Sequence, residues 1–173
     1  MLARRVYEAS HLEGEFTLRS GQVSSEYFDK YRFEADPALL RDLATALVPL
    51  VPRGMEVLAG LELGGIPLVT MLSQATGLPA RFVRKQAKTY GTCEISEGGP
   101  VAGARVCLVE DVISTGGAVV DAASALRDAG AFVEHVVCVI DRGTGREGLA
   151  AIGVEMLALF TKADLEAASA APA

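Results

Sequence analysis

The sequence predicts an α/β fold in which a mostly parallel central sheet is flanked by helices, and two observations support this. Apolar strand-like segments alternate with single helical segments along most of the chain, an order typical of parallel sheets covered on both faces. Half of the 173 residues are hydrophobic, which is enough for a substantial core. No repeat or linker interrupts the alternation, so we expect residues 1–173 to form a single domain.

The helices are indicated by their end signals. A short helix is expected over residues 2–9. Asp36 is a suitable N-cap and Pro37 suits the first helical position, so a helix is predicted from Pro37 to Leu50. Gly77 and Gly130 are suitable residues to end two further helices. Those helices are predicted over residues 65–76 and 118–129, and another over residues 144–151.

The strands are indicated by short apolar runs between the helices. Two segments lack a clear period. Residues 16–33 are polar with extended stretches, and residues 85–103 hold four glycines and suit a long loop with room for a hairpin. The small polar residues from Ala167 onward predict a frayed tail. The predicted strands cover residues 57–60, 79–83, 105–109, 132–140 and 154–160.

Composition argues against several classes of function. The formal net charge of −6 argues against nucleic-acid binding as the main function. No apolar run approaches the roughly 20 residues that cross a bilayer, and residues 1–5 lack the apolar stretch of a signal peptide. Cys93, Cys107 and Cys138 have no metal-like spacing. We therefore expect a cytoplasmic protein that binds neither membranes nor nucleic acid.

One segment indicates the kind of ligand: Arg105-Val-Cys-Leu-Val-Glu-Asp-Val-Ile-Ser-Thr-Gly-Gly-Ala118. Its apolar strand ends in two acids, Glu110 and Asp111, and a Ser-Thr-Gly-Gly turn then opens a helix. The turn offers backbone N–H groups, hydroxyls and a helix N-terminus to one anion. The acids suit sugar hydroxyls or a hydrated Mg²⁺. A phosphate beside a polyol indicates a phosphorylated sugar.

Four basic residues gather at the start of the long loop and just before it: Arg81, Arg84, Lys85 and Lys88. Such a group can be an ordinary solvated surface. On an acidic protein, however, a local basic group more often serves a small anionic ligand, and we favour that interpretation.

Three motifs together resemble a known family. Residues 109–118 resemble the phosphoribosyl diphosphate (PRPP) motif of type I phosphoribosyltransferases. Phe16-Thr-Leu-Arg-Ser-Gly21 with Ser24-Ser-Glu-Tyr-Phe-Asp-Lys30 is similar to the N-terminal signature of orotate phosphoribosyltransferases. Phe82-Val-Arg-Lys-Gln-Ala-Lys-Thr-Tyr-Gly91 is similar to the catalytic loop of the same enzymes. The motifs occur in the expected order, and the resemblance covers about residues 1–165.

This resemblance implies an activity and a domain plan. Orotate and PRPP would give orotidine 5′-phosphate and diphosphate in pyrimidine biosynthesis, with Mg²⁺ carried by PRPP and not held directly by the protein. Residues 1–35 would form a small N-terminal hood, and residues 85–103 a catalytic lid. The family also implies a homodimer with shared active sites, in which each lid reaches the neighbouring site.

The expected chemistry explains a basic lid. Displacement at an anomeric carbon passes through an oxocarbenium-like transition state, and cations neutralise the charge that grows on the leaving diphosphate. By resemblance Lys88 matters most for catalysis, Arg84 and Lys85 contact phosphates, and closure excludes water. Tyr90 stands in place of the usual lid histidine. Its hydroxyl can donate to a phosphate but carries no positive charge at pH 7.

Further PRPP contacts are assigned to the segment that follows Val109. Glu110 and Asp111 would accept hydrogen bonds from ribose hydroxyls and stabilise positive charge on the sugar, so both join Lys88 as candidate catalytic residues. The turn from Gly60 to Gly65 has two open interpretations: it would hold the diphosphate, or it is an ordinary strand-to-helix turn. Some family members carry a lysine at the position of Gly64, and this chain does not. The remaining PRPP contacts are Val112, Ile113, Ser114, Thr115, Gly116, Gly117 and Ala118, with Thr115 to Ala118 on the 5′-phosphate.

The acceptor is assigned to other residues. By resemblance Arg142 binds the orotate carboxylate, which suits the bidentate geometry of arginine. Ser114 would add a hydrogen bond, Phe28 would cover the base, and Arg19 stands where some relatives have lysine. Two alternatives stay open: a phosphoribosyltransferase for another base, and a non-catalytic regulator that senses PRPP or a nucleotide. The acidic charge and the lid lysines favour an enzyme, and Arg142 favours an acidic pyrimidine.

Overall fold

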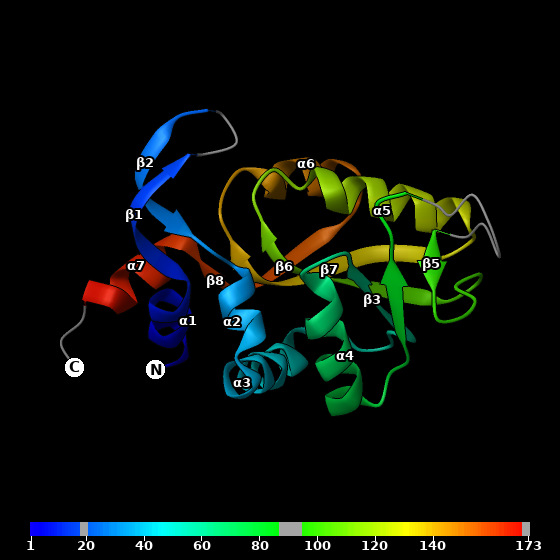
Figure 1. The fold of residues 1–173 in the computed structure, drawn as a ribbon. Helices are drawn as coiled ribbons and strands as arrows, with labels where there is room; N and C mark the ends of the chain where they lie inside the picture. Colours follow the sequence, from blue (N-terminus) through cyan, green and yellow to red (C-terminus); the bar gives the residue numbers. More distant parts are fainter. Residues whose placement is uncertain (18–20, 87–94, 171–173) are drawn as a thin grey trace.

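The computed structural model describes residues 1–17, 21–86 and 95–170. Its centre is a six-stranded sheet with the strand order β5-β4-β3-β6-β7-β8 (Figure 1). Neighbouring strands are parallel except β4 and β5, which are antiparallel. This confirms the predicted, mostly parallel sheet. The strands are β3 (Val57–Leu61), β4 (Ala80–Val83), β5 (Ser96–Glu97), β6 (Arg105–Ile113), β7 (Phe132–Asp141) and β8 (Glu155–Thr161).

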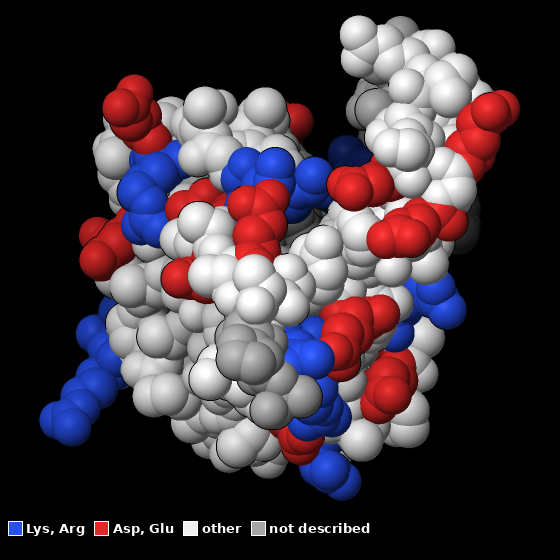
Figure 2. Space-filling model, turned by 90° about the vertical axis from the view of Figure 1, so that its left-hand side faces the viewer, with Lys and Arg blue, Asp and Glu red and all other residues white. Residues whose placement is uncertain are grey.

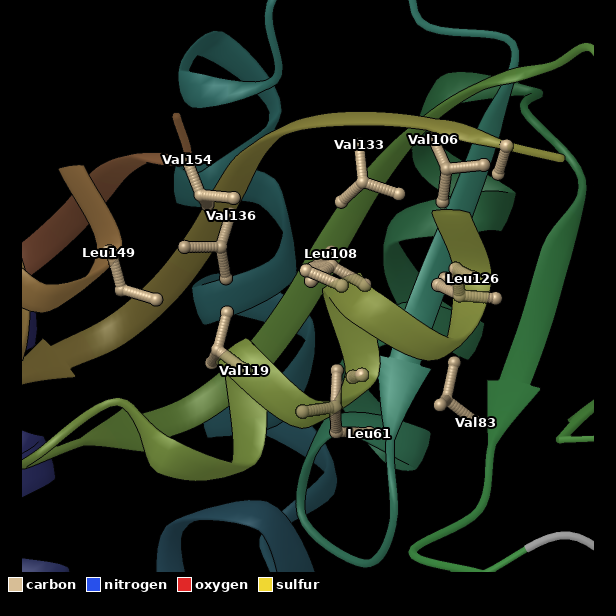
Figure 3. Packing of buried hydrophobic residues seen from close by; sticks show 14 of the residues in the cluster. Leu61, Val83, Val106, Leu108, Val119, Leu126, Val133, Val136, Leu149 and Val154 are labelled. Carbon is tan, nitrogen blue, oxygen red and sulfur yellow. The ribbon is translucent and has the colours of Figure 1, made fainter. Parts of the chain in front are cut away.

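Helices cover both faces of the sheet, as predicted. On one face Val119 and Leu126 of α5 (Gly117–Asp128) and Leu149 of α6 (Gly145–Ala151) pack among Leu108 and Val136 of the sheet (Figure 3). Full burial of such aliphatic side chains stabilises the fold by about 1.5–3 kcal/mol each. None of the helices in the described residues combines the length and apolarity that crossing a membrane requires. The other face packs against α1 (Leu2–Ser10), α3 (Pro37–Leu47), α4 (Gly65–Thr76) and α7 (Lys162–Ala170), with the 3₁₀ turn η1 (Val48–Leu50) after α3.

A two-stranded antiparallel sheet projects from this body (Figure 1). It consists of β1 (His11–Thr17) and β2 (Val23–Phe28), and the short helix α2 (Tyr31–Ala35) follows. The predicted hood covered residues 1–35; from here on we use the name hood for residues 11–35, which hold β1, β2 and α2. The described residues of the hairpin carry three glutamates and no lysine or arginine, and acidic side chains lie along this projecting part (Figure 2). Helix α1, in contrast, packs against α7 and α3 in the helical layer.

Two expectations from the sequence need correction. The strand expected to end at Val109 continues to Ile113, because β7 still pairs with β6 after the last β3 partner, Gly60. The tail from Ala167 is helical as far as Ala170, because α7 is anchored by the buried Leu165. The long segment after Lys85 includes β5, whose antiparallel pairing with β4 agrees with the expected room for a hairpin. Residues 87–94 of this segment lie outside the described part of the chain.

The carboxyl ends of the central strands position the site. Two loops are joined there by backbone hydrogen bonds, from Arg142 N to Ile113 O (2.8 Å) and from Gly145 N to Ser114 O (2.9 Å). Gly65 packs directly on β6, since a Cβ at that position would lie 2.4 Å from the carbonyl oxygen of Val109. Ligands of open parallel sheets bind at this edge. The fold therefore brings the segments that follow β3, β6 and β7 together at this edge.

Candidate functional site

A cavity of about 260 Å³ lies at the carboxyl end of β6. Four separate segments line it: the hood, the loop after β3, the start of the segment after β4, and the turn between β6 and α5. We call it the phosphoribosyl cavity. It brings together most of the residues that the sequence assigned to PRPP. Its lining residues are Lys30, Tyr31, Glu62, Leu63, Lys85, Glu110 and the run from Val112 to Val119.

The turn between β6 and α5 is shaped by glycine. Gly116 is the N-cap of α5 and has a φ of +80°, a left-handed conformation that favours glycine. A Cβ at Gly116 would lie 3.3 Å from Cγ of Leu149, so the neighbouring helix leaves little room. Gly117 and Ala118 at the start of α5 border the cavity. The unpaired N–H groups and the positive end of the helix dipole therefore lie beside it, and both suit a phosphate.

The adjacent acids of β6 have different surroundings. Glu110 is 8% exposed and lines the phosphoribosyl cavity, whereas Asp111 is 0% exposed and does not line it. Nζ of Lys30 lies 3.0 Å from Oδ1 and 2.7 Å from Oδ2 of Asp111. The backbone N–H of Val112 also donates to Oδ1 of Asp111. Of the two acids predicted to face ribose, the structure thus places Glu110 on the cavity and Asp111 against Lys30.

Glu34 of α2 joins these two acids in a buried group that we call the acid cluster: Glu34, Glu110 and Asp111. Burial, helped by the neighbouring Asp111, raises the pKa of Glu34 to about 9 and that of Glu110 to about 10. Burial also opposes the charge of Asp111, but hydrogen bonds with Glu110, Glu34 and Lys30 lower its pKa overall. At neutral pH the cluster therefore carries one negative charge, on Asp111, opposite the Lys30 ammonium group.

Gly64 makes room for the acid cluster. A Cβ at this position would lie 1.8 Å from Oδ2 of Asp111 and 2.7 Å from Oε1 of Glu34. The preceding Glu62–Leu63 peptide bond is cis. Because no side chain fits at Gly64, the positive charge beside Asp111 comes from Lys30. The sequence reasoning missed this residue, and its one signal was its place at the end of the N-terminal signature.

Arg142 and Phe28, both assigned to the base, meet in the structure. The guanidinium carbon of Arg142 lies 5.6 Å from the centroid of the Phe28 ring. Together they line a second cavity, of about 180 Å³, between the hood, the end of β7 and α7. Ser114 lines the phosphoribosyl cavity instead. The other residues of the second cavity are Tyr7, His11, Glu26, Tyr27, Ile140, Lys162, Leu165 and Glu166.

Each of the two histidines lies close to a glutamate side chain. His11 stacks on Tyr7, with 4.7 Å between ring centroids, and its Nε2 lies 3.5 Å from Oε2 of Glu26. His135 lies on β7, and its Nε2 is 3.6 Å from Oε2 of Glu155 on β8. Neither lines the phosphoribosyl cavity.

The basic residues around the lid separate in the structure. Lys85 lines the phosphoribosyl cavity and also a neighbouring cavity of about 440 Å³ beside α5. Arg84 lines the neighbouring cavity but not the phosphoribosyl cavity. Its Nη1 lies 3.9 Å from Oε1 of Glu97 on β5. The remaining predicted site residues, Arg19, Lys88 and Tyr90, lie outside the described residues.

Comparison with known proteins agrees with this geometry. Residues 33–159 match the family described as phosphoribosyl transferase domain. An orotate phosphoribosyltransferase from Nocardioides sp. is 57% identical over 173 residues, which cover 99% of this chain and 97% of the relative. The solved orotate phosphoribosyltransferase of Mycobacterium tuberculosis, in complex with Fe(III) dicitrate, is 33% identical to this chain, with a TM-score of 0.86. The match covers 95% of this chain and 96% of that one.

The M. tuberculosis enzyme has also been solved in complex with 5-phospho-α-D-ribosyl 1-diphosphate, which is PRPP. That structure is 31% identical to this chain with a TM-score of 0.81, again with 95% and 96% coverage. Identity at this level, over nearly the full length of both chains, shows more than a shared fold. The chain belongs to the phosphoribosyl transferase domain family and, within it, to the orotate phosphoribosyltransferases.

Proposed function

We propose that this chain transfers the 5-phosphoribosyl group of PRPP to orotate, which gives orotidine 5′-phosphate and diphosphate in pyrimidine biosynthesis. The observation that carries the proposal is the phosphoribosyl cavity, in which the N-terminus of α5 borders the same space as Glu110 and Lys85. The relative solved with PRPP supports this donor. The names of the relatives support orotate as the acceptor.

Each part of the donor has a place in this proposal. The turn from Thr115 to Ala118 binds the 5′-phosphate through N–H groups and a hydroxyl. Glu110 lies beside the ribose, and Lys85 borders the diphosphate. As the bond from the anomeric carbon to diphosphate breaks and the bond to the base nitrogen forms, positive charge develops on the sugar. We assign Lys88 and Tyr90 of the lid, with Arg84 just before it, to the charge on the leaving diphosphate.

Arg142 and Phe28 are assigned to orotate, with Ser114 and Arg19 as further contacts. The guanidinium group of Arg142 suits a carboxylate. The backbone N–H of Arg142 donates to Ile113 O, which ties the base-binding residue to the end of β6. This link supports the proposal that the acceptor binds beside the anomeric carbon of a sugar phosphate held at the turn.

Mg²⁺ fits as an ion that PRPP carries. The diphosphate oxygens of PRPP are the hard ligands that Mg²⁺ prefers. Bound in this way, the ion would neutralise charge on the leaving group.

We also propose a homodimer in the cytoplasm, with each lid completing the neighbouring site, as the family resemblance implies. Mixing Lys88→Ala protein with Arg142→Gln protein tests it. Hybrid dimers would contain one site with both native residues, so activity should rise above that of either variant alone. Light scattering that shows a monomer, together with no recovery on mixing, would contradict the shared site.

The activity itself is tested by following the loss of orotate absorbance and the release of diphosphate, with PRPP and Mg²⁺ present. Turnover with a purine but not with orotate would identify a phosphoribosyltransferase for another base. PRPP binding without turnover on any base would identify a regulator.

The lid is tested by Lys88→Ala. Removal of a cation that stabilises transition-state charge should lower kcat by about 100- to 1000-fold. Arg53→Ala, at an exposed position after η1, is the control and should keep full activity. An unchanged kcat in Lys88→Ala would end the catalytic assignment of the lid lysine.

A further inference from the structure

Lys30 belongs to the hood, but its side chain reaches the central sheet. It lies in the short connection between β2 and α2, 81 positions before Asp111, and its ammonium group contacts both carboxylate oxygens of that residue. The Lys30 side chain is 33% exposed and borders the phosphoribosyl cavity, while Asp111 is completely buried. The pair therefore links the hood to strand β6 at the edge of the cavity.

We propose that Lys30 is a positioning residue of the phosphoribosyl site, which holds the Asp111 carboxylate and offsets the charge of the acid cluster so that an anionic phosphoribosyl donor can bind. This inference rests on the proposed function. It assigns to the hood a part in binding the donor as well as the base.

The contacts around Asp111 make Lys30 hard to replace. Among the basic side chains in the described part of the chain, only Lys30 pairs with Asp111. Its other partners are the backbone N–H of Val112 and the carboxyl groups of Glu34 and Glu110, which bring no positive charge. A side chain at Gly64 would overlap the Asp111 carboxylate. Without Lys30, a buried carboxylate would lie uncompensated between Glu110 and Val112, two residues that line the cavity.

An uncompensated buried charge has two consequences. It is costly in itself, because a carboxylate that leaves water needs a partner. It also repels a ligand that carries several negative phosphate charges, and in a site of low dielectric this repulsion is stronger than in water. With Lys30 in place the pair is neutral, so the positive end of α5 and Lys85 can dominate the field at the cavity.

The same contact also fixes the hood. The connection that carries Lys30 is anchored by backbone hydrogen bonding from Asp29 N to Ser10 O (2.8 Å) and by the N–H of Tyr31, which donates to Oδ1 of Asp29. Nζ of Lys30 lies 5.2 Å from the centre of the Tyr31 ring. A role in holding the hood alone would change stability, whereas the proposed role changes affinity for PRPP, so the two can be separated by experiment.

The first test measures PRPP binding by calorimetry and steady-state kinetics in Lys30→Met. We expect the Kd and KM for PRPP to rise about 10-fold or more, as for the loss of one buried charge partner, while kcat changes less than the KM for PRPP. Lys30→Arg keeps the charge and should recover most of the affinity. Arg41→Met removes a cation from an exposed pair with Asp42 on α3, and should leave the Kd unchanged.

The second test removes the charge that Lys30 offsets. The double variant Lys30→Met/Asp111→Asn leaves no charge in the pair, so its Kd for PRPP should be lower than that of Lys30→Met alone, whatever its turnover. The groups facing Asp111 are Lys30, Glu34 and Glu110, with Asp29 facing Glu34. Without Lys30 the Asp111 carboxyl protonates more readily. The Kd of Lys30→Met divided by the Kd of wild type should therefore be smaller at pH 5 than at pH 8.

Several outcomes would overturn the inference. One is a Lys30→Met protein with a lowered Tm but a wild-type Kd for PRPP below that temperature, which would assign Lys30 to the stability of the hood alone. Another is a Kd ratio that is the same at pH 8 and pH 5, with no rescue in the double variant. Failure of the wild-type chain to bind PRPP or to turn over orotate would instead refute the proposed function.

Discussion

The turn between β6 and α5 and the hood border the same cavity, but they are built in different ways. The turn is made of backbone: a glycine with positive φ, the first N–H groups of α5, and hydrogen bonds to the loop after β7. The hood contributes through side chains, with Lys30 on Asp111 and Phe28 against Arg142. Most of the hairpin is exposed, and its connection to the body depends on α2, whose Phe33 is fully buried.

This difference indicates which changes each region tolerates. A backbone site is sensitive to the conformation of a few glycines and insensitive to most side chains. A site made by side chains from distant parts of the sequence is sensitive to the loss of either partner. The reason is that a buried polar group left without its partner destabilises the protein by more than the contact had stabilised it. We therefore expect substitutions in the turn and in the hood to affect different parameters.

The largest effect is expected from Gly116→Val in the turn. A β-branched residue at φ +80° is strained, and its side chain would meet Leu149. The N–H groups of the turn would then move away from the 5′-phosphate, so kcat/KM for PRPP should fall by on the order of 100-fold. Steady-state kinetics at saturating orotate measures this.

Gly148→Ala is the matched control for that substitution. Gly148 is in α6, and a Cβ there would meet no atom within 4 Å. It should leave kinetics unchanged and should keep or increase stability by about 0.5–1 kcal/mol. Wild-type affinity for PRPP in Gly116→Val would show that the turn is not the phosphate site.

The next effect concerns the base side, where the end of β7 meets the hood. Arg142→Gln removes a charge-assisted contact worth about 1.5–3 kcal/mol, so the KM for orotate should rise by about 10- to 100-fold. The KM for PRPP should change little, because Arg142 does not line the phosphoribosyl cavity. Equal increases for both substrates would mean that the two regions are not separable.

A smaller effect is expected on the pH dependence of stability. Burial raises the pKa of Glu34 from its ordinary value of 4.5 to about 9, so its contribution to stability is complete below pH 4.5 and is lost as the pH rises through about 9. Asp111 acts in the opposite sense: its pKa is lowered, so its contribution is present above pH 3.8 and is lost in stronger acid.

Glu34→Gln keeps the side chain neutral at every pH. The free energy of unfolding should therefore fall less steeply between pH 5 and pH 9 than in wild type, with a difference below the limit of about 1.4 kcal/mol per pH unit for one proton. Urea unfolding at pH 5, 7 and 9 measures the slope, and Glu147→Gln, at an exposed position on α6, is the control. Identical slopes would show that Glu34 is ionised in the folded protein.

The smallest effect is expected where the hood joins the body. Oδ1 of Asp36 accepts hydrogen bonds from the backbone N–H groups of Ala38 and Leu39, at 2.9 and 2.8 Å. Asp36→Ala should lower the free energy of unfolding by about 1 kcal/mol, typical of an N-cap. The KM for PRPP should stay unchanged; a large increase would indicate that the orientation of α3 controls the hood.

Much of the molecule could be predicted from the sequence because the determining interactions are local. A helix shows its cap and its period within a few residues, so α4 was predicted with its observed bounds, and Asp36 was identified as the cap of α3. The turn from Ser114 to Gly117 could also be predicted, since the strand, the glycines and the helix follow one another directly in the sequence.

The tertiary structure decided the features that depend on neighbours distant in sequence. Strand β6 continues to Ile113 because β7 pairs with it, and α7 forms because Leu165 is buried against the helical layer. The sequence predicts the same role for Glu110 and Asp111. In the structure, however, Glu110 lines the cavity, whereas Asp111 is fully buried and pairs with Lys30. The sequence by itself predicted a phosphorylated sugar at the turn after β6, because the strand, the acids and the glycines are contiguous there. The partner of Asp111 is a lysine 81 residues away that no local pattern shows, because an ion pair follows distance in space and not distance along the chain.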